Sequence, residues 1–114
     1  MLNANVLAAV LEFQRKRDWE QFHKPKELAA AVTVEASELL EIFQWKSHEE
    51  MACLLDGPSR ERVEDEIADV VTLLSYLCHD LGLDVNAAVL AKLQKNEAKY
   101  PVEKSYGNAR KYDE

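Results

Sequence analysis

Two segments of the sequence share one pattern, a pair of carboxylates three residues apart beside an apolar stripe at helical spacing. The pairs are Glu35 with Glu38 and Glu66 with Asp69. Projected at about 100° per residue, Glu35 and Glu66 fall inside the stripes, and Glu38 and Asp69 border them. A carboxylate in apolar surroundings costs on the order of several kcal/mol unless it is neutralised, paired or bound to a cation. The fold must therefore neutralise these acids.

The two stripes consist of large apolar residues. They contain Leu28, Val32, Leu39, Ile42 and Phe43 in the first segment, and Val63, Ile67, Val70, Leu74, Leu77 and Leu81 in the second. An isolated acid pair at this spacing usually faces water. Neither apolar side offers a Lys or Arg as an ion-pair partner, and the pattern occurs twice. Both facts favour a cation site shared by the four acids. Carboxylate oxygens are hard ligands, which suit Mg²⁺ or Mn²⁺.

Composition limits the class of protein. A chain of 114 residues is expected to form one domain over residues 1–114, and its limited core predicts oligomerisation. The formal charge of −7 and the lack of a basic run argue against nucleic acid or an anionic membrane as partner. A small-molecule partner is expected.

The two cysteines and the N-terminal segment bear on location. Cys53 and Cys78 lie in apolar stretches, which is typical of reduced core thiols in a cytoplasmic protein. Residues 1–13 are apolar but lack a basic leader region, and Glu12 interrupts them, so neither a targeting segment nor a membrane span is expected.

The chain is predicted to be all-α, because it has three Gly and three Pro and no sustained strand-like alternation. We expect about five helices. Their predicted ranges are residues 3–17, 25–45, 48–55, 60–81 and 85–99. Pro25 suits a first turn, Ser47 with Glu50 matches a capping box, Gly82 ends the fourth helix and Asp84 caps the fifth. Residues from about 101 to 114 are expected to form a polar tail.

Two further groups have both a structural and a functional interpretation. Lys92, Asn96 and Lys99 form one polar row on the fifth helix, which would ordinarily be a solvated face. Four residues with aromatic or imidazole rings cluster at the two ends of the first inter-helix region. They are Trp19, Phe22, His23 and Trp45. Core packing is the ordinary role for such rings, and stacking on a flat base is the functional alternative.

These segments resemble a known family. The E-x-x-E at Glu35 and the E-x-x-D at Glu66 are similar to the two halves of the MazG-like, all-α nucleoside triphosphate pyrophosphohydrolases. Four blocks are more particular and resemble the dCTP pyrophosphatase branch. They are residues 17–23, residues 43–46, the stretch from Lys92 through Asn96 to Pro101, and residues 110–112.

The resemblance implies a four- to five-helix bundle of the all-α NTP pyrophosphatase type, completed by oligomerisation. It implies hydrolysis of a dNTP, with dCTP or a modified dCTP preferred, to dNMP and pyrophosphate in nucleotide-pool sanitation. Carried over by position, Mg²⁺ would be held by the catalytic acids Glu35, Glu38, Glu66 and Asp69. Trp19 and Trp45 would contact the nucleoside, and Lys92 and Asn96 the phosphate or sugar.

The chain departs from this branch at two positions. Leu73 stands where an aromatic residue is expected one turn after the last acid, and Val10 stands where some relatives have histidine. A broader dNTP or NTP specificity is therefore an alternative. The role of Glu41, and the identity of the carboxylate that activates water, stay open.

Two other classes give different expectations. A di-iron bundle would use Glu-x-x-His ligand sets, which Glu20 and His23 supply only once. A non-enzymatic helical dimerisation module would leave all four acids in water, and it gives no reason for Glu35 and Glu66 to lie in the stripes.

Overall fold

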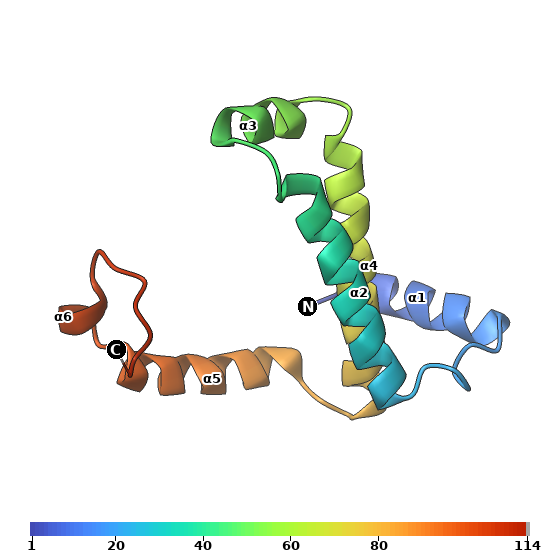
Figure 1. The fold of residues 1–114 in the computed structure, drawn as a ribbon. Helices are drawn as coiled ribbons and strands as arrows, with labels where there is room; N and C mark the ends of the chain where they lie inside the picture. The colour runs from blue at the N-terminus through green and yellow to red at the C-terminus, as the bar shows by residue number, and fades with distance from the viewer. Residues whose placement is uncertain (114) are drawn as a thin grey trace. The chain divides into compact units, whose positions relative to one another are not determined.

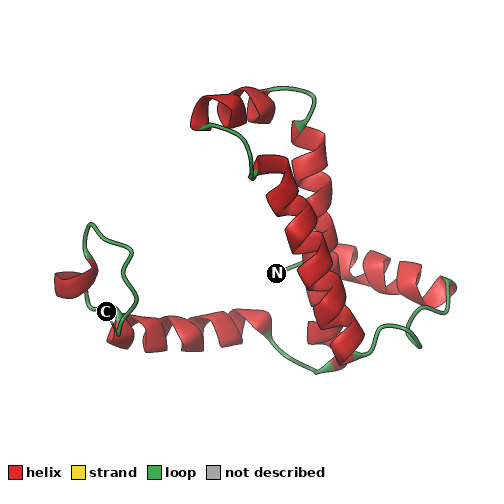
Figure 2. Cartoon of the chain, viewed as in Figure 1, coloured by secondary structure: helices red, strands yellow, loops and turns green. Residues whose placement is uncertain are grey.

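The computed structural model describes residues 1–113, and these residues form six helices and no strand (Figures 1 and 2). The helices are α1 (Ala4–Lys16), α2 (Pro25–Phe43), α3 (His48–Asp56), α4 (Arg60–Asp80), α5 (Val85–Lys99) and α6 (Val102–Ser105). The predicted all-α class is confirmed. The chain divides into a unit of residues 2–81 and a unit of residues 82–114 with Met1. A single domain over residues 1–114 stays a prediction.

Local signals in the sequence set most helix ends. Pro25 occupies the first turn of α2, and Ser47 and Glu50 form the expected capping box of α3. The Asp84 side chain accepts hydrogen bonds from the backbone N–H groups of Asn86 and Ala87 at the start of α5. Gly82 follows α4 at φ +60°, a left-handed conformation in which glycine is unstrained.

One predicted boundary was wrong. Helix α2 ends at Phe43 rather than near Trp45, because residues 44 and 45 turn toward the capping box of α3. The segment after Pro101, which was expected to be a polar tail, contains a short sixth helix, α6, where about five helices were predicted. A four-residue helix is shorter than the span over which apolar periodicity can be recognised.

The core of residues 2–81 lies between α2 and α4, which run in opposite directions side by side (Figure 1). Leu28 is fully buried and Ile42 is 3% exposed, and both come from α2. Val63 and Tyr76 are the buried hydrophobic residues of α4. The Tyr76 hydroxyl also donates a hydrogen bond to the Val10 carbonyl oxygen at 2.8 Å, which ties α1 to α4.

Much apolar surface is left exposed within each unit. In residues 2–81 the exposed side chains include Val34, Leu40 and Ile67, and α5 exposes Val89, Leu90 and Leu93. The expectation that both cysteines are core thiols was wrong for Cys53, which is exposed; both cysteines are free. No helix among the described residues is long and apolar enough to cross a membrane.

Candidate functional site

The two helices of the core bring three of the four predicted acids together. Glu35, Glu38 and Glu66 each offer a carboxylate oxygen, and these oxygens lie within 4.8 Å of one another. Helical periodicity explains the placement, because Glu35 is seven residues from both Leu28 and Ile42, and this spacing puts all three on the core face of α2. On α4, Glu66 is one turn from the buried Val63.

The cluster contains two carboxylate oxygens that are shielded from solvent. The Oε2 atoms of Glu35 and Glu66 are buried and have no hydrogen-bond partner among the described residues. A buried acceptor without a partner costs about 1 to 3 kcal/mol, and a charged one costs more. When all three carboxyl groups are ionised, the described residues therefore leave both oxygens unsatisfied, at the two positions where the sequence placed an acid inside an apolar stripe.

The same environment changes the acidity of Glu35. Burial raises the pKa of Glu35 from 4.5 to about 7, and the neighbouring carboxyl groups of Glu66 and Glu38 favour its protonated form as well. The negative charge of Asp69 raises it further. Without a cation, this carboxyl group is therefore partly protonated at neutral pH.

Asp69 lies outside the close cluster. It is exposed on α4, three residues beyond Glu66, and it acts on Glu35 through its charge. Glu41 is also exposed, toward the end of α2. The structure thus brings Glu35, Glu38 and Glu66 together, with Asp69 outside this group, whereas the helical projection placed Glu38 and Asp69 alike at the borders of the stripes.

The donor set fits a hard divalent cation. Three carboxylates from two helices present oxygens within one small volume, and two of these groups have an oxygen with no other partner. Mg²⁺ and Mn²⁺ prefer such ligands, and a bound cation removes both the repulsion and the unsatisfied acceptors. These acids are therefore the residues of this chain that could hold a metal.

The structure does not bring the two tryptophans together. Trp19 precedes the first turn of α2 and Trp45 follows its last turn, so the length of α2, about 27 Å at 1.5 Å per residue, separates them. Trp45 is 86% exposed, so the core-packing interpretation was wrong for it. Within one chain the two rings cannot enclose the same base.

Trp19 belongs to a ring cluster that joins α1, the following loop and α4. Its indole lies edge-on to Phe13 at 5.6 Å and to His23 at 6.1 Å between centroids. His23 stacks on Tyr76, and its Nδ1 atom is 2.8 Å from Nε2 of the buried Gln14. Sequence analysis missed Gln14, because a lone glutamine in an apolar helix gives no periodic signal.

This cluster also bears on the di-iron alternative. His23 is engaged by Gln14 and Tyr76 and is not part of the carboxylate group that could hold a metal. The Glu20 and His23 pair therefore does not complete a ligand set with the acids of α2 and α4. The dimerisation alternative, in which all four acids face water, is likewise contradicted by the buried oxygens of Glu35 and Glu66.

The predicted phosphate-side residues lie in the other unit. On α5, Lys92 is exposed and Asn96 is half-buried, and their spacing of four residues puts them on one face of the helix with Lys99. Binding of the substrate's phosphate or sugar by Lys92 and Asn96, beside a cation held by the acids, stays a prediction.

Comparison with known proteins identifies the family. The model of the MazG-like family matches residues 30–114, which include all four acids. The chain belongs to the MazG-like family. It is similar to proteins named dCTP pyrophosphatase 1, with 41% identity over 102 residues to that of Bos taurus and 39% over 109 residues to that of Homo sapiens.

The extent of these similarities differs between relatives. The alignments take in 89% and 90% of this MazG-like chain, but the chain spans only about 60% of the length of the bovine and human proteins. A crystal structure of a pyrophosphatase from Archaeoglobus fulgidus is similar with 43% identity and a TM-score of 0.77, over 85% of this chain and 90% of that one. The MazG-like resemblance and the all-α fold predicted from sequence are therefore confirmed.

The raised pKa of Glu35 predicts a pH-dependent stability in the absence of metal. The folded state holds this proton up to about pH 7, and the unfolded state loses it near 4.5. The stabilisation is thus complete below pH 4.5 and is lost as the pH rises to 7. In EDTA, the unfolding free energy of the wild type should fall by about 1 to 3 kcal/mol more between pH 5 and 8 than that of Glu35→Gln.

Urea unfolding at a series of pH values measures this difference. Asp65→Asn, an exposed acid next to Glu66 on α4, is the matched control and should keep the wild-type pH dependence. If Glu35→Gln also keeps it, Glu35 is an ordinary solvated carboxylate.

Proposed function

We propose that this MazG-like protein hydrolyses a deoxynucleoside triphosphate, with dCTP or a modified dCTP as the expected substrate, to dNMP and pyrophosphate. The observation that carries the proposal is the group of Glu35, Glu38 and Glu66 with its two buried, unpartnered oxygens. The names of the bovine and human relatives and of the archaeal pyrophosphatase support the same reaction class. Removal of damaged or excess nucleotides is the expected physiological role.

Glu35, Glu38, Glu66 and Asp69 are proposed to hold Mg²⁺, with Mn²⁺ as a substitute. When bound, such a cation neutralises the phosphate oxygens and the leaving pyrophosphate. Without it, this acidic surface would repel a triphosphate, which carries roughly four negative charges at neutral pH. The carboxylates therefore both bind the cation and make binding of the anionic substrate depend on it.

The proton on Glu35 links metal binding to pH. Because the pKa of Glu35 is raised to about 7, a cation at this site must displace that proton before the carboxylate can act as a full ligand. Cation affinity should rise as the pH increases toward 8. One of the same carboxylates would orient and deprotonate the attacking water, since no His or Cys belongs to the cluster among the described residues.

Trp45 is the stronger candidate for contact with the base. Its indole is 86% exposed and no aromatic partner contacts it among the described residues, whereas Trp19 is 41% exposed and packs against Phe13 and His23. A site that uses both tryptophans would need a second copy of the chain. The exposed Val34, Leu40 and Ile67 support such a homo-oligomer, a dimer or tetramer.

Lys92 and Asn96 are proposed to bind the phosphate or sugar, because they offer a cation and an amide on one helix face. The free cysteines Cys53 and Cys78 support a reducing, cytoplasmic location. A broader dNTP or NTP specificity is the second candidate. It is favoured by Leu73, a half-buried aliphatic residue on α4 where cytosine-preferring relatives are expected to have an aromatic ring.

The reaction class predicts the products and the metal requirement. Incubation of the purified protein with dCTP and Mg²⁺ should give dCMP and pyrophosphate in one step, and EDTA should stop the reaction. Glu35→Gln and Glu66→Gln should reduce kcat by about 100-fold or more, since electrostatic groups at reacting phosphates typically contribute this much. Asp65→Asn should leave the rate unchanged. Separation of products by anion-exchange chromatography is the measurement, and stepwise release of orthophosphate through dCDP would contradict the proposal.

Stacking on Trp45 predicts a selective loss of nucleotide binding. Trp45→Ala should weaken binding of a non-hydrolysable dCTP analogue by about 1 to 3 kcal/mol, the range for base stacking on an aromatic side chain. Phe22→Ala is the control, because Phe22 is another exposed aromatic residue at the opposite end of α2. Calorimetric titration with Mg²⁺ present measures the dissociation constants. An unchanged constant for a folded Trp45→Ala protein would remove this tryptophan from the site.

A further inference from the structure

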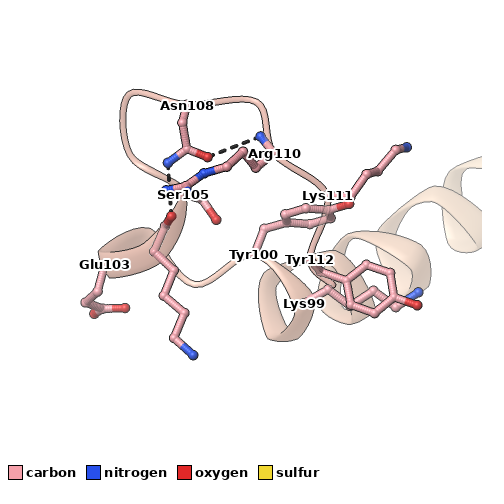
Figure 3. A pocket seen from close by; sticks show the side chains of 9 residues that line it. Lys99, Tyr100, Glu103, Ser105, Asn108, Arg110, Lys111 and Tyr112 are labelled. Atoms are coloured by element: carbon pink, nitrogen blue, oxygen red, sulfur yellow. Dashed lines mark hydrogen bonds between the residues drawn. The ribbon is translucent and has the colours of Figure 1, made fainter. Parts of the chain in front are cut away.

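The unit of residues 82–114 contains a pocket of about 330 Å³ at its C-terminal end. The last residues of α5, the short helix α6 and the loop after it surround this pocket (Figure 3). Its lining residues are Lys99, Tyr100, Glu103, Lys104, Ser105, Asn108, Arg110, Lys111 and Tyr112. None of them belongs to the carboxylate cluster of α2 and α4.

The pocket has a charge opposite to that of the whole chain. Four of its lining residues are cationic, namely Lys99, Lys104, Arg110 and Lys111, and Glu103 is the one acid among them. The chain as a whole carries −7. Among the described residues, no carboxylate forms an ion pair with Lys104 or Arg110. A positive site in an acidic protein is a selective place for an anion, because the surrounding charge disfavours anions elsewhere.

Specific contacts hold the loop in the shape that forms the pocket. The side chain of Asn108 donates a hydrogen bond to the Lys104 carbonyl oxygen at 3.1 Å and accepts one from the backbone N–H of Arg110 at 3.2 Å (Figure 3). Gly107 turns the chain at φ +80°, where a Cβ atom would be strained. These contacts hold the backbone of Arg110, in the loop, close to that of Lys104, in α6.

A pair of tyrosines closes the other side. The rings of Tyr100 and Tyr112 meet edge to face at 6.1 Å between centroids, and the Lys99 ammonium lies 4.8 Å from the centre of the Tyr112 ring. In Figure 3 Glu103 lies on the opposite side of the pocket from these rings. The pocket thus combines a cation-rich lining with hydroxyl and amide hydrogen-bond donors from Tyr100, Ser105 and Asn108.

We propose that this C-terminal pocket is a binding site for a diphosphate or triphosphate group. The lining offers ammonium and guanidinium donors, which form strong charge-assisted hydrogen bonds with phosphate oxygens. The volume of about 330 Å³ is at the lower end of the range for small-ligand pockets and admits a short polyphosphate rather than a nucleic-acid strand. Lys104 and Arg110, which form no ion pair with a carboxylate among the described residues, suit a ligand with several negative charges better than a single carboxylate.

A diphosphate or triphosphate group could come from either of two molecules. Only the identity of these molecules rests on the proposed function; the binding site itself does not. One source is the triphosphate of the nucleotide substrate, and the other is the free pyrophosphate released as product. Binding can be measured in EDTA without any turnover. An inactive protein can therefore still satisfy the proposal, and an active enzyme can still contradict it.

Calorimetric titration of the full chain with sodium pyrophosphate in EDTA tests the site. The wild type should bind it, and Lys104→Ala and Arg110→Ala should each weaken binding by about tenfold or more, as expected for loss of one charge-assisted hydrogen bond. Arg110→Lys should cause a smaller loss, because it keeps the charge without the guanidinium fork. Glu103→Gln should tighten binding.

Lys95→Ala is the matched control, because Lys95 is exposed on α5 outside the pocket and its loss changes the net charge equally. It should bind pyrophosphate as the wild type does. The proposal is overturned if the wild type does not bind pyrophosphate, or if Lys104→Ala and Arg110→Ala bind it as tightly as Lys95→Ala. Circular dichroism shows whether the variants remain folded, and amide NMR shifts for residues 99–113 locate the bound anion independently of them.

A second comparison distinguishes the two sources. If the pocket holds the substrate's triphosphate, a non-hydrolysable dNTP analogue should also bind in EDTA, and Arg110→Ala should raise KM. If the pocket holds the product, the analogue should not bind there, and Arg110→Ala should relieve inhibition by pyrophosphate without changing KM. Either result supports a polyphosphate site.

Discussion

The carboxylate site of residues 2–81 depends on one constraint, the apolar packing of α2 against α4. Leu28 and Ile42 anchor the core face of α2, and the same periodicity brings Glu35 between them toward Glu66. Apolar packing therefore supplies the free energy that holds like charges together. The result is a site in which two carboxylate oxygens have no hydrogen-bond partner within residues 1–113 and the pKa of Glu35 is raised to about 7.

Such a site lowers the stability of the metal-free fold but provides ligands for a cation. Without a cation, the fold carries the cost of desolvated acids, which explains why uncharged replacements at these positions are expected to keep the protein folded while removing activity. With a cation, the same groups become ligands, and binding to the folded state alone increases stability by mass action. The α2–α4 pair thus holds the carboxylates in place, and a bound cation, rather than other side chains, would satisfy their buried oxygens.

The sequence was sufficient to predict α1 to α5 and the proximity of Glu35, Glu38 and Glu66, because both depend on local periodicity and capping. Ser47 with Glu50 and Asp84 specify helix starts through hydrogen bonds within a few residues. The placement of Glu35 and Glu66 followed from the apolar stripes alone. The confirmed family resemblance depended on the same residues in the same order.

Features set by contacts between distant residues could not be predicted in this way. The position of Trp45, 86% exposed beyond the end of α2, depends on where the helix stops. The pairing of the buried Gln14 with His23 and Tyr76 depends on how α1 meets α4. The basic pocket depends on a loop that Asn108 folds back toward α6. In each case the sequence shows the residues, but no regular spacing indicates their partners.

Binding of a divalent cation by Glu35 and Glu66 can be measured by titrating the full chain with Mn²⁺ at pH 7.5 and following the free ion by electron paramagnetic resonance. We expect the wild type and Asp65→Asn to bind Mn²⁺. Glu35→Gln and Glu66→Gln should each lose affinity by about tenfold or more, since each removes a charged ligand. Equal Mn²⁺ affinity in all four proteins, or no binding by the wild type, would show that these acids do not form a cation site.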